Sequence, residues 1–240
     1  MLNEPIKFYP VTERFNTFQG EGVHMGRSAF FIRTYGCPVK CPWCDSAGTW
    51  HPQYVPDHIT KLNVDELVAE VKEAQPLIVV VTGGEPAAHD LDPLVRGLHE
   101  YPIHLETSGA LPIRGNFSWI TLSPKKWRMP LAENVLAASE FKLIIETPED
   151  IRFYTDFIVD IEMSNRRIDE GRPMSPIWLH PEWSQRDNKE VLAAISNAVK
   201  QDKTYRFRAG WQLHKLYRVD ALDPRSAPLV PLGGNPEKGF

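Results

Sequence analysis

The sequence predicts an α/β fold in which mostly parallel strands form a partial (β/α) TIM-like barrel. Short apolar runs alternate with amphipathic stretches, an order typical of parallel sheets joined by helical crossovers. Polar clusters follow several of the apolar runs, at the strand ends where such sheets gather their chemistry. These clusters are Cys37, Gly83-Gly84-Glu85, Thr107-Ser108-Gly109 and Ser123-Pro124-Lys125.

The expected strands are short runs rich in apolar and β-branched side chains, which favour extended structure. They lie at residues 28–35, 77–82, 103–107, 119–122, 141–145, 177–180 and 205–207. Right-handed crossovers between parallel neighbours would curl this sheet into a full or partial barrel.

Helices are expected at residues 63–74, 89–100, 148–157 and 188–200. In the first of these, apolar side chains recur at the spacing of one helix face, at Val64, Leu67, Val68 and Val71. Asn63 is a suitable N-cap, and Glu66 stands three residues later, as in a capping box. This helix is therefore the best defined of the four.

The chain has 240 residues, which suffice for one full-sized hydrophobic core and make a second large domain unnecessary. We expect residues 1–222 to form the barrel domain. Residues 223–240 contain four prolines and three glycines, so we expect an irregular C-terminal tail there.

The composition is ordinary, with 42% hydrophobic and 24% charged residues and a formal net charge of −4. This mild acidity gives no reason to expect broad nucleic-acid or membrane binding. The apolar run at 77–81 is too short to span a bilayer, and the first ten residues hold no apolar signal core. We therefore expect a cytoplasmic protein without a membrane or nucleic-acid partner.

The only cysteines are Cys37, Cys41 and Cys44, separated by three and then two residues. An odd, clustered set is a poor disulfide framework and indicates ligation of a metal or cluster. A loop of this spacing can place three thiolates on three irons of a [4Fe–4S] cluster. The fourth iron would then be open to a chelating ligand such as S-adenosylmethionine (SAM). A zinc site completed by His51 or His24, or a redox-active thiol pair, also fits the spacing.

Two motifs together resemble the radical-SAM superfamily. The first is the cysteine segment, with Trp43 directly before its third cysteine, and the second is Gly83-Gly84-Glu85-Pro86 at a strand end. Further segments resemble 7-carboxy-7-deazaguanine synthases. They are Phe18-Gln19-Gly20-Glu21-Gly22, Phe31-Ile32-Arg33-Thr34, Cys44-Asp45-Ser46, Thr49-Trp50, Leu105-Glu106-Thr107-Ser108-Gly109 and Ser123-Pro124-Lys125. After residue 139 the similarity thins to matches such as Gln212-Leu213-His214-Lys215.

This resemblance implies a radical-SAM type barrel with few helices and a carbon–nitrogen lyase activity. The family converts 6-carboxy-5,6,7,8-tetrahydropterin to 7-carboxy-7-deazaguanine with loss of ammonia, a ring contraction on the route to 7-deazapurines such as queuosine. It uses a [4Fe–4S] cluster, SAM as a reusable cofactor, and Mg²⁺. The resemblance also implies a homodimer and a reducing electron donor such as flavodoxin. Whether the product serves transfer RNA or DNA modification stays open.

The resemblance also implies site residues. The cofactor-binding residues are Trp43, Asp45, Gly84, Glu85, Ser123, Pro124 and Lys125, with His180 in place of a glutamine in a late SAM-binding stretch. Ser46 matches the Mg²⁺ ligand, and the substrate-binding residues are Phe18, Gln19, Gly20, Arg33 and Thr82. The planar guanidinium of Arg33 suits a bidentate contact with a carboxylate. No catalytic side chain is implied beyond the cluster and SAM, because the cofactor carries the difficult step.

Two other functions fit parts of the pattern. A radical-SAM activase that places a radical on a partner protein's glycine shares the cysteine spacing. The 19–22 segment and Arg33 instead favour a small carboxylated substrate. The non-enzymatic alternative is a zinc-stabilised RNA-binding module, because residues 203–218 mix basic and aromatic side chains. These are Arg206, Arg208, Lys215 and Arg218 with Trp211 and Tyr217.

Overall fold

A computed structural model of the chain describes residues 7–165 and 174–218. The domain boundary expected at residue 222 and the tail expected at 223–240 lie outside the described residues. None of the described helices is long and apolar enough to cross a membrane.

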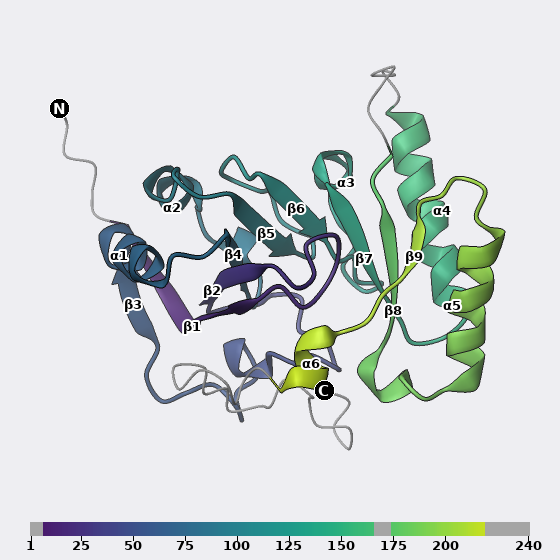
Figure 1. Cartoon of the computed structure of the whole chain (residues 1–240), viewed down its shortest axis with the longest axis horizontal. Helices are drawn as coiled ribbons and strands as arrows, with labels where there is room; N and C mark the ends of the chain where they lie inside the picture. Colours follow the sequence, from purple (N-terminus) through teal and green to yellow (C-terminus); the bar gives the residue numbers. More distant parts are fainter. Residues whose placement is uncertain (1–6, 166–173, 219–240) are drawn as a thin grey trace.

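A single nine-stranded sheet organises the described chain, in the order β3-β1-β2-β4-β5-β6-β7-β8-β9 (Figure 1). The strands are β1 (Phe8–Phe18), β2 (Ser28–Thr34), β3 (Thr60–Asn63), β4 (Ile78–Gly83), β5 (Ile103–Thr107), β6 (Trp119–Leu122), β7 (Glu140–Ile145), β8 (Ile177–Pro181) and β9 (Phe207–Ala209). Every pair from β2 to β9 is parallel, whereas β1 is antiparallel to both β2 and β3. The two edges do not pair, so the sheet is an open, partial barrel, as predicted.

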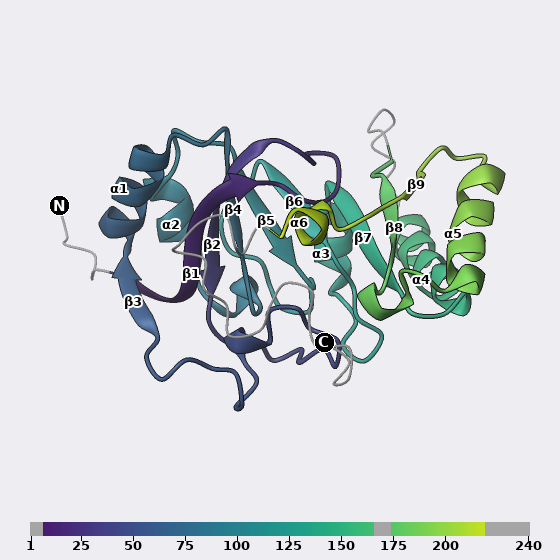
Figure 2. The ribbon, with the colours of Figure 1, turned by 60° about the horizontal axis from the view of Figure 1, so that its bottom comes forward.

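The helices are few and mostly short. They are α1 (Val64–Ala74), α2 (Asp92–Gly97), α3 (Ala132–Ala137), α4 (Glu149–Ser164), α5 (Lys189–Gln201) and α6 (Leu213–Tyr217), with 3₁₀ turns η1 (Ala47–Thr49), η2 (Pro86–Ala88) and η3 (Trp183–Gln185). α1 to α5 lie along the outside of the sheet, whereas α6 lies apart from them, near the turn after β1 (Figures 1 and 2).

Two hydrophobic cores lie between the sheet and the outer helices. One joins β1, β2, β4 and β5 to α1 and α2, and the other joins β6, β7 and β8 to α3, α4 and α5. Successive side chains of a strand point to opposite faces of the sheet, so they show which face belongs to the core. In β4, Val79 and Val81 pack in the first core, whereas Ile78 and Val80 belong to a small separate cluster on the other face. The outer face therefore stabilises the fold, and the inner face is left for the site.

Six of the seven predicted strands lie close to their expected bounds, whereas β1, β3, α3 and α6 were not predicted. The strand expected at 205–207 contains only Phe207, because Tyr205 has a positive φ of 58° and is 88% exposed. The helix expected at 89–100 is confined to α2, and the one expected at 148–157 continues to Ser164.

Candidate active site

A cavity of about 1310 Å³, its open mouth included, lies on the inner face at the carboxyl ends of the parallel strands. Of the predicted site residues, Pro124 and His180 do not line it. Those that do are Phe18, Gln19, Gly20, Arg33, Cys37, Cys41, Trp43, Cys44, Asp45, Ser46, Thr82, Gly84, Glu85, Ser123 and Lys125. The fold thus brings together, in one cavity, residues from the first strand to the loop after β6.

The three thiols follow β2 on one loop, and none forms a disulfide. A short hairpin after β6 fixes this loop, because Trp127 Nε1 donates to the Val39 carbonyl at 2.8 Å and Arg128 Nη1 donates to the Pro38 carbonyl at 2.9 Å. Burial raises the pKa of the Cys41 thiol to about 12. Burial also raises the pKa values of Cys37 and Cys44. Iron bound here would replace the three thiol protons.

A [4Fe–4S] cluster and a zinc site place different demands on the three thiols. Zinc needs its ligands to converge at about 2.3 Å from one point. Among the described residues, no three cysteine, histidine or acidic side chains converge in this way. Thiolates that bind separate irons of a cubane need no common point. The donor set therefore fits a [4Fe–4S] cluster.

The Gly83-Gly84 pair lets the chain after β4 pass close to the cysteine loop. Gly84 N donates to the Thr34 carbonyl at 3.0 Å, and Glu85 N donates to the Gly36 carbonyl at 2.8 Å. A Cβ on Gly84 would overlap the Gly36 carbonyl, and Gly83 has a φ of +149°. The two glycines therefore allow two segments of backbone to approach each other closely.

Glu85 is buried and orders the next strand end. Its carboxylate accepts from the Thr107 hydroxyl at 2.5 Å, from Ser108 N at 2.9 Å, from the Ser108 hydroxyl, and from Ala87 N at 3.1 Å. These four bonds match the number of lone-pair sites on a carboxylate. Glu85 therefore joins the Gly-Gly-Glu segment to the Thr107-Ser108 turn in the cavity wall.

Lys125 and Trp43 lie together on the cysteine side of the cavity. Lys125 Nζ donates to the Ser123 carbonyl at 2.6 Å and contacts its hydroxyl at 2.7 Å. The same ammonium lies 5.5 Å from the centre of the Trp43 ring. Burial lowers the pKa of Lys125. Pro124 lies between Ser123 and Lys125 in the sequence and restricts the backbone there.

Arg33 and Gln19 supply polar groups on the opposite side. Arg33 Nε donates to Glu13 Oε2 at 2.6 Å, and this buried pair leaves the terminal nitrogens of the guanidinium for a ligand. Gln19 Nε2 donates to Glu106 Oε1 at 2.9 Å, and Gln19 Oε1 accepts from Glu21 N at 3.2 Å. Since each amide atom can form a second hydrogen bond, Gln19 can still contact a ligand.

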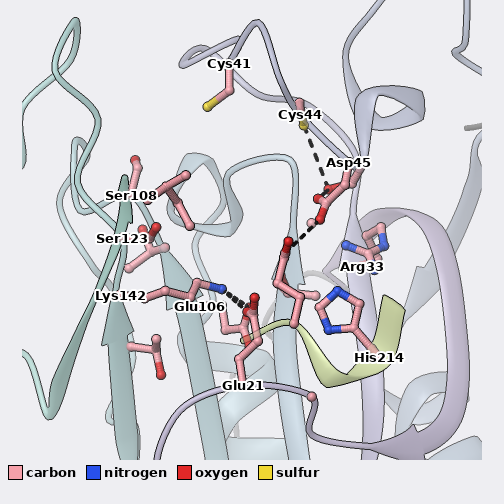
Figure 3. Close-up of a pocket in the computed structure, with 18 of the residues that line it drawn as sticks. Glu21, Arg33, Cys41, Cys44, Asp45, Glu106, Ser108, Ser123, Lys142 and His214 are labelled. Carbon is pink, nitrogen blue, oxygen red and sulfur yellow. Dashed lines mark hydrogen bonds and ion pairs between the residues drawn. The ribbon is translucent and has the colours of Figure 1, made fainter. Parts of the chain in front are cut away.

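Lys142 is a charged centre of the cavity that the sequence analysis did not assign. Its ammonium pairs with Glu21 and lies 3.5 Å from Glu106 Oε2 (Figure 3). Burial acts to lower the pKa of Lys142, but the two carboxylates outweigh it and raise that pKa. Burial acts to raise the pKa of Glu21, and Lys142 with the nearby histidines holds it well below its usual range. Lys142 and Glu21 are therefore both charged at neutral pH.

His180 lies behind the cavity wall. Its side chain is fully buried, its Nδ1 is 3.9 Å from Glu21 Oε1, and a Cβ on Gly210 would overlap its ring. Burial lowers its pKa to about 4, so the ring is neutral. The residues that follow it, Pro181, Glu182 and Trp183, line the cavity instead.

α6 closes one side of the cavity. Leu213 N donates to the Gly20 carbonyl at 3.0 Å, and the His214 ring occupies the space that a Cβ on Gly20 would need. Lys215 Nζ lies 3.3 Å from Asp45 Oδ2. Of the basic residues expected to contact RNA, Arg206 and Lys215 pair internally, Arg206 through two bonds with Glu162 at 2.9 and 2.8 Å, whereas Arg208 and Arg218 are exposed.

Comparison with known proteins places this site in a family. The Radical SAM superfamily model matches residues 31–124. The chain is 44% identical to a 7-carboxy-7-deazaguanine synthase of Synechocystis over 78% of this chain and 85% of that protein. It is 38% identical to the synthase of Prochlorococcus marinus over 86% of this chain and 96% of that protein. The crystal structure of QueE from Escherichia coli superposes with a TM-score of 0.69 at 28% identity, covering 86% of this chain and 95% of that one. The chain therefore belongs to the 7-carboxy-7-deazaguanine synthase family of radical-SAM enzymes.

Proposed function

We propose that this enzyme converts 6-carboxy-5,6,7,8-tetrahydropterin to 7-carboxy-7-deazaguanine with release of ammonia, in 7-deazapurine biosynthesis of the queuosine type. The product is the one that the relatives' names give. The observation that carries the proposal is that three free thiols and the Arg33 guanidinium, whose Nε pairs with Glu13, share one cavity. A guanidinium in this setting suits a small carboxylated substrate.

The cofactor side of the cavity is assigned as follows. Cys37, Cys41 and Cys44 would hold the [4Fe–4S] cluster that the superfamily uses, and reduction of the cluster with SAM on its open iron supplies a deoxyadenosyl radical. Contacts with SAM are proposed for residues around the thiols, which also exclude water from the reacting groups. They are Trp43, Asp45, Gly84, Ser123 and Lys125, with Pro124 fixing the turn and Glu85 contributing through its backbone, because its carboxylate already accepts four hydrogen bonds.

The substrate side begins at the carboxylate, which we assign to the terminal nitrogens of Arg33. Phe18, Gln19, Gly20 and Thr82 would orient the pterin ring. Because Glu21, Lys142 and Glu106 already form a charged group there, they can complement the donor and acceptor edge of the ring without moving. This orientation, rather than a side-chain acid or base, is the contribution of the protein.

Mg²⁺ is proposed at Ser46. Its hydroxyl lines the cavity 3.4 Å from Asp45 Oδ1. Mg²⁺ prefers oxygen ligands and commonly retains waters or substrate oxygens, so the substrate carboxylate would complete its shell. We also propose a homodimer, a flavodoxin-type electron donor, cytoplasmic localisation, and a single barrel domain over residues 1–222.

The test is an anaerobic assay of the cluster-reconstituted enzyme with SAM, Mg²⁺, a reductant and the carboxypterin, with mass spectrometry of the products. We expect the deazaguanine and one equivalent of ammonia. A matched Cys44→Ala protein should give neither. The proposal is wrong if enzyme that cleaves SAM leaves the carboxypterin unchanged. In that case, radical transfer to a protein glycine becomes the function to examine.

A further inference from the structure

α6 makes contact with two segments that are far apart in the sequence. Its residue Lys215 lies 3.3 Å from the carboxylate of Asp45, directly after the third cysteine. The same ammonium lies 4.8 Å from the centre of the Trp183 ring, just past β8. One buried cation therefore joins the cysteine loop to the end of β8 across the cavity mouth.

The geometry around Lys215 is that of a fixed bridge. The Lys215 side chain is only 4% exposed and that of Asp45 is 30% exposed. Gln212 Nε2 donates to the same Asp45 oxygen at 3.3 Å, and Lys215 N donates to the Gln212 carbonyl at 3.1 Å. Gln212 and Lys215 thus hold Asp45 from the two ends of one helical turn. An ion pair this shielded from water is much less weakened by solvent than an exposed one.

α6 is itself anchored, so that the bridge has a rigid support. The Leu213 amide donates to the Gly20 carbonyl, and the Tyr217 ring meets the Phe18 ring edge-on at 5.4 Å between centres. Figure 3 shows His214 on the ribbon of α6, facing the cavity below Asp45. Movement of Lys215 would therefore require α6 to detach from the 18–20 segment.

We propose that Lys215 is a positioning residue for SAM: it holds the Asp45 carboxylate and the Trp183 ring in the arrangement that receives the cofactor. This inference deepens the proposed function and rests on its assignment of Asp45 to SAM. Lys215 touches neither the thiols nor the reacting atoms. Its effect passes through Asp45, so loss of the ammonium should weaken SAM binding while the cluster stays in place.

The test measures SAM binding to cluster-reconstituted enzyme by anaerobic equilibrium dialysis, with iron content determined on the same samples. For Lys215→Met we expect a Kd about tenfold higher, equivalent to about 1.4 kcal/mol, with unchanged iron. Lys215→Arg, which keeps the charge, should restore most of the affinity. Lys200→Met, a change on the exposed face of α5, is the matched control and should bind SAM normally.

A double-mutant cycle identifies the route of the effect. If Lys215 acts through Asp45, the double variant Lys215→Met, Asp45→Asn should bind SAM no more weakly than Asp45→Asn alone. The inference would be overturned if the two changes raised the Kd for SAM by independent factors that multiply. It would also be overturned if Lys215→Met bound SAM normally or lost iron. If the Lys215→Met protein does not fold, Lys215→Gln replaces it in the double-mutant cycle. Because the readout is SAM binding, failure of the inference is distinguishable from absence of turnover with the carboxypterin.

Discussion

At the scale of single residues, Arg33 should separate substrate binding from cofactor binding. Arg33→Lys keeps a positive charge but loses the planar guanidinium group. The lysine ammonium cannot pair with both Glu13 and the substrate carboxylate in the geometry that the guanidinium allows. We expect the KM for the carboxypterin to rise about tenfold or more, since one charge-assisted bond is worth about 1.5–3 kcal/mol. Steady-state kinetics together with the Kd for SAM would measure this.

The matched change is Glu13→Gln, which leaves the fork intact and removes its buried partner. It should raise the KM less than Arg33→Lys does. Equal losses of SAM and carboxypterin affinity in Arg33→Lys would contradict the assignment of Arg33 to the substrate.

Gly84 gives a second prediction, about the support of the cysteine loop. In Gly84→Ala, the added methyl would collide with the Gly36 carbonyl and the Cys37 side chain, both of which belong to that loop. Backbone cannot yield cheaply, so we expect a loss of about 2 kcal/mol or more in stability, and reduced iron incorporation. Iron content per chain after reconstitution is the measurement.

Gly26→Ala is the control for Gly84. Gly26 also has a positive φ, +84°, but a Cβ there meets nothing within 4 Å. It should show the cost of backbone strain alone, about 1 kcal/mol, with full iron incorporation. Equal iron loss in both variants would show that the contact with the cysteine loop is not the cause.

Residues within short motifs could be predicted from the sequence, and partners distant along the chain could not. The spacing of the three cysteines, Cys37, Cys41 and Cys44, was enough to predict that they bind a metal or a cluster. The Lys142–Glu21 pair spans 121 positions, which no local pattern encodes. A partial signal exists in β7, where Lys142 alternates with the core residues Phe141 and Leu143 and must therefore face inward.

At the scale of elements, regular amphipathic helices were predictable and irregular elements were not. β1 contains Pro10 and a buried Glu13, so apolar and polar residue types do not alternate cleanly along its sequence. β3 is a four-residue edge strand with the sequence Thr-Lys-Leu-Asn. α6 has only five residues and no side-chain cap among its hydrogen bonds. Tertiary contacts, rather than local propensity, stabilise it.

The start of α1 tests a feature that the sequence did predict. Asn63 Oδ1 accepts from Glu66 N at 3.0 Å, and Glu66 Oε2 accepts from Asn63 N at 2.7 Å, which is the expected capping box. Asn63→Ala should lower the free energy of unfolding by about 1 kcal/mol. Urea denaturation would measure the loss, and the Kd for SAM should not change because α1 lies on the outer face.

Glu66→Ala removes the reciprocal bond of the capping box. If the box acts as a unit, the double variant should lose less stability than the sum of the two single changes. A strictly additive result would mean that the two hydrogen bonds act independently.

At the scale of the whole molecule, the site forms only when the strands of the sheet lie side by side, because its residues come from nearly the whole length of the chain. Its lining runs from Phe15 in β1 to Lys215 in α6, and Leu213 of α6 donates to the Gly20 carbonyl just after β1, although α6 follows the last strand. The alternation of strands and helices predicted a parallel sheet. It could not reveal that β1 would insert between β2 and β3 as an antiparallel strand.

The buried histidines predict how the whole fold responds to acid. Burial lowers the pKa of His104 to about 4, with His24 and Arg27 adding to the effect, and burial lowers that of His180 to about 4 as well. Below about pH 6.5 the unfolded chain binds protons at these two positions and the folded protein does not. The free energy of unfolding should therefore fall as the pH decreases from about 6.5 to about 4, by up to about 3 kcal/mol for each histidine.

Urea unfolding of the iron-free protein at a series of pH values would measure this slope without interference from the cluster. His104→Phe removes one titrating group while keeping a ring beside His24, so its slope between pH 6.5 and 4 should be shallower than that of the unmodified protein. His58→Gln, at an exposed position, should leave the slope unchanged. Because the slope depends on the difference in bound protons between the folded and unfolded states, a slope that His104→Phe does not alter would mean that folding does not lower the pKa of His104.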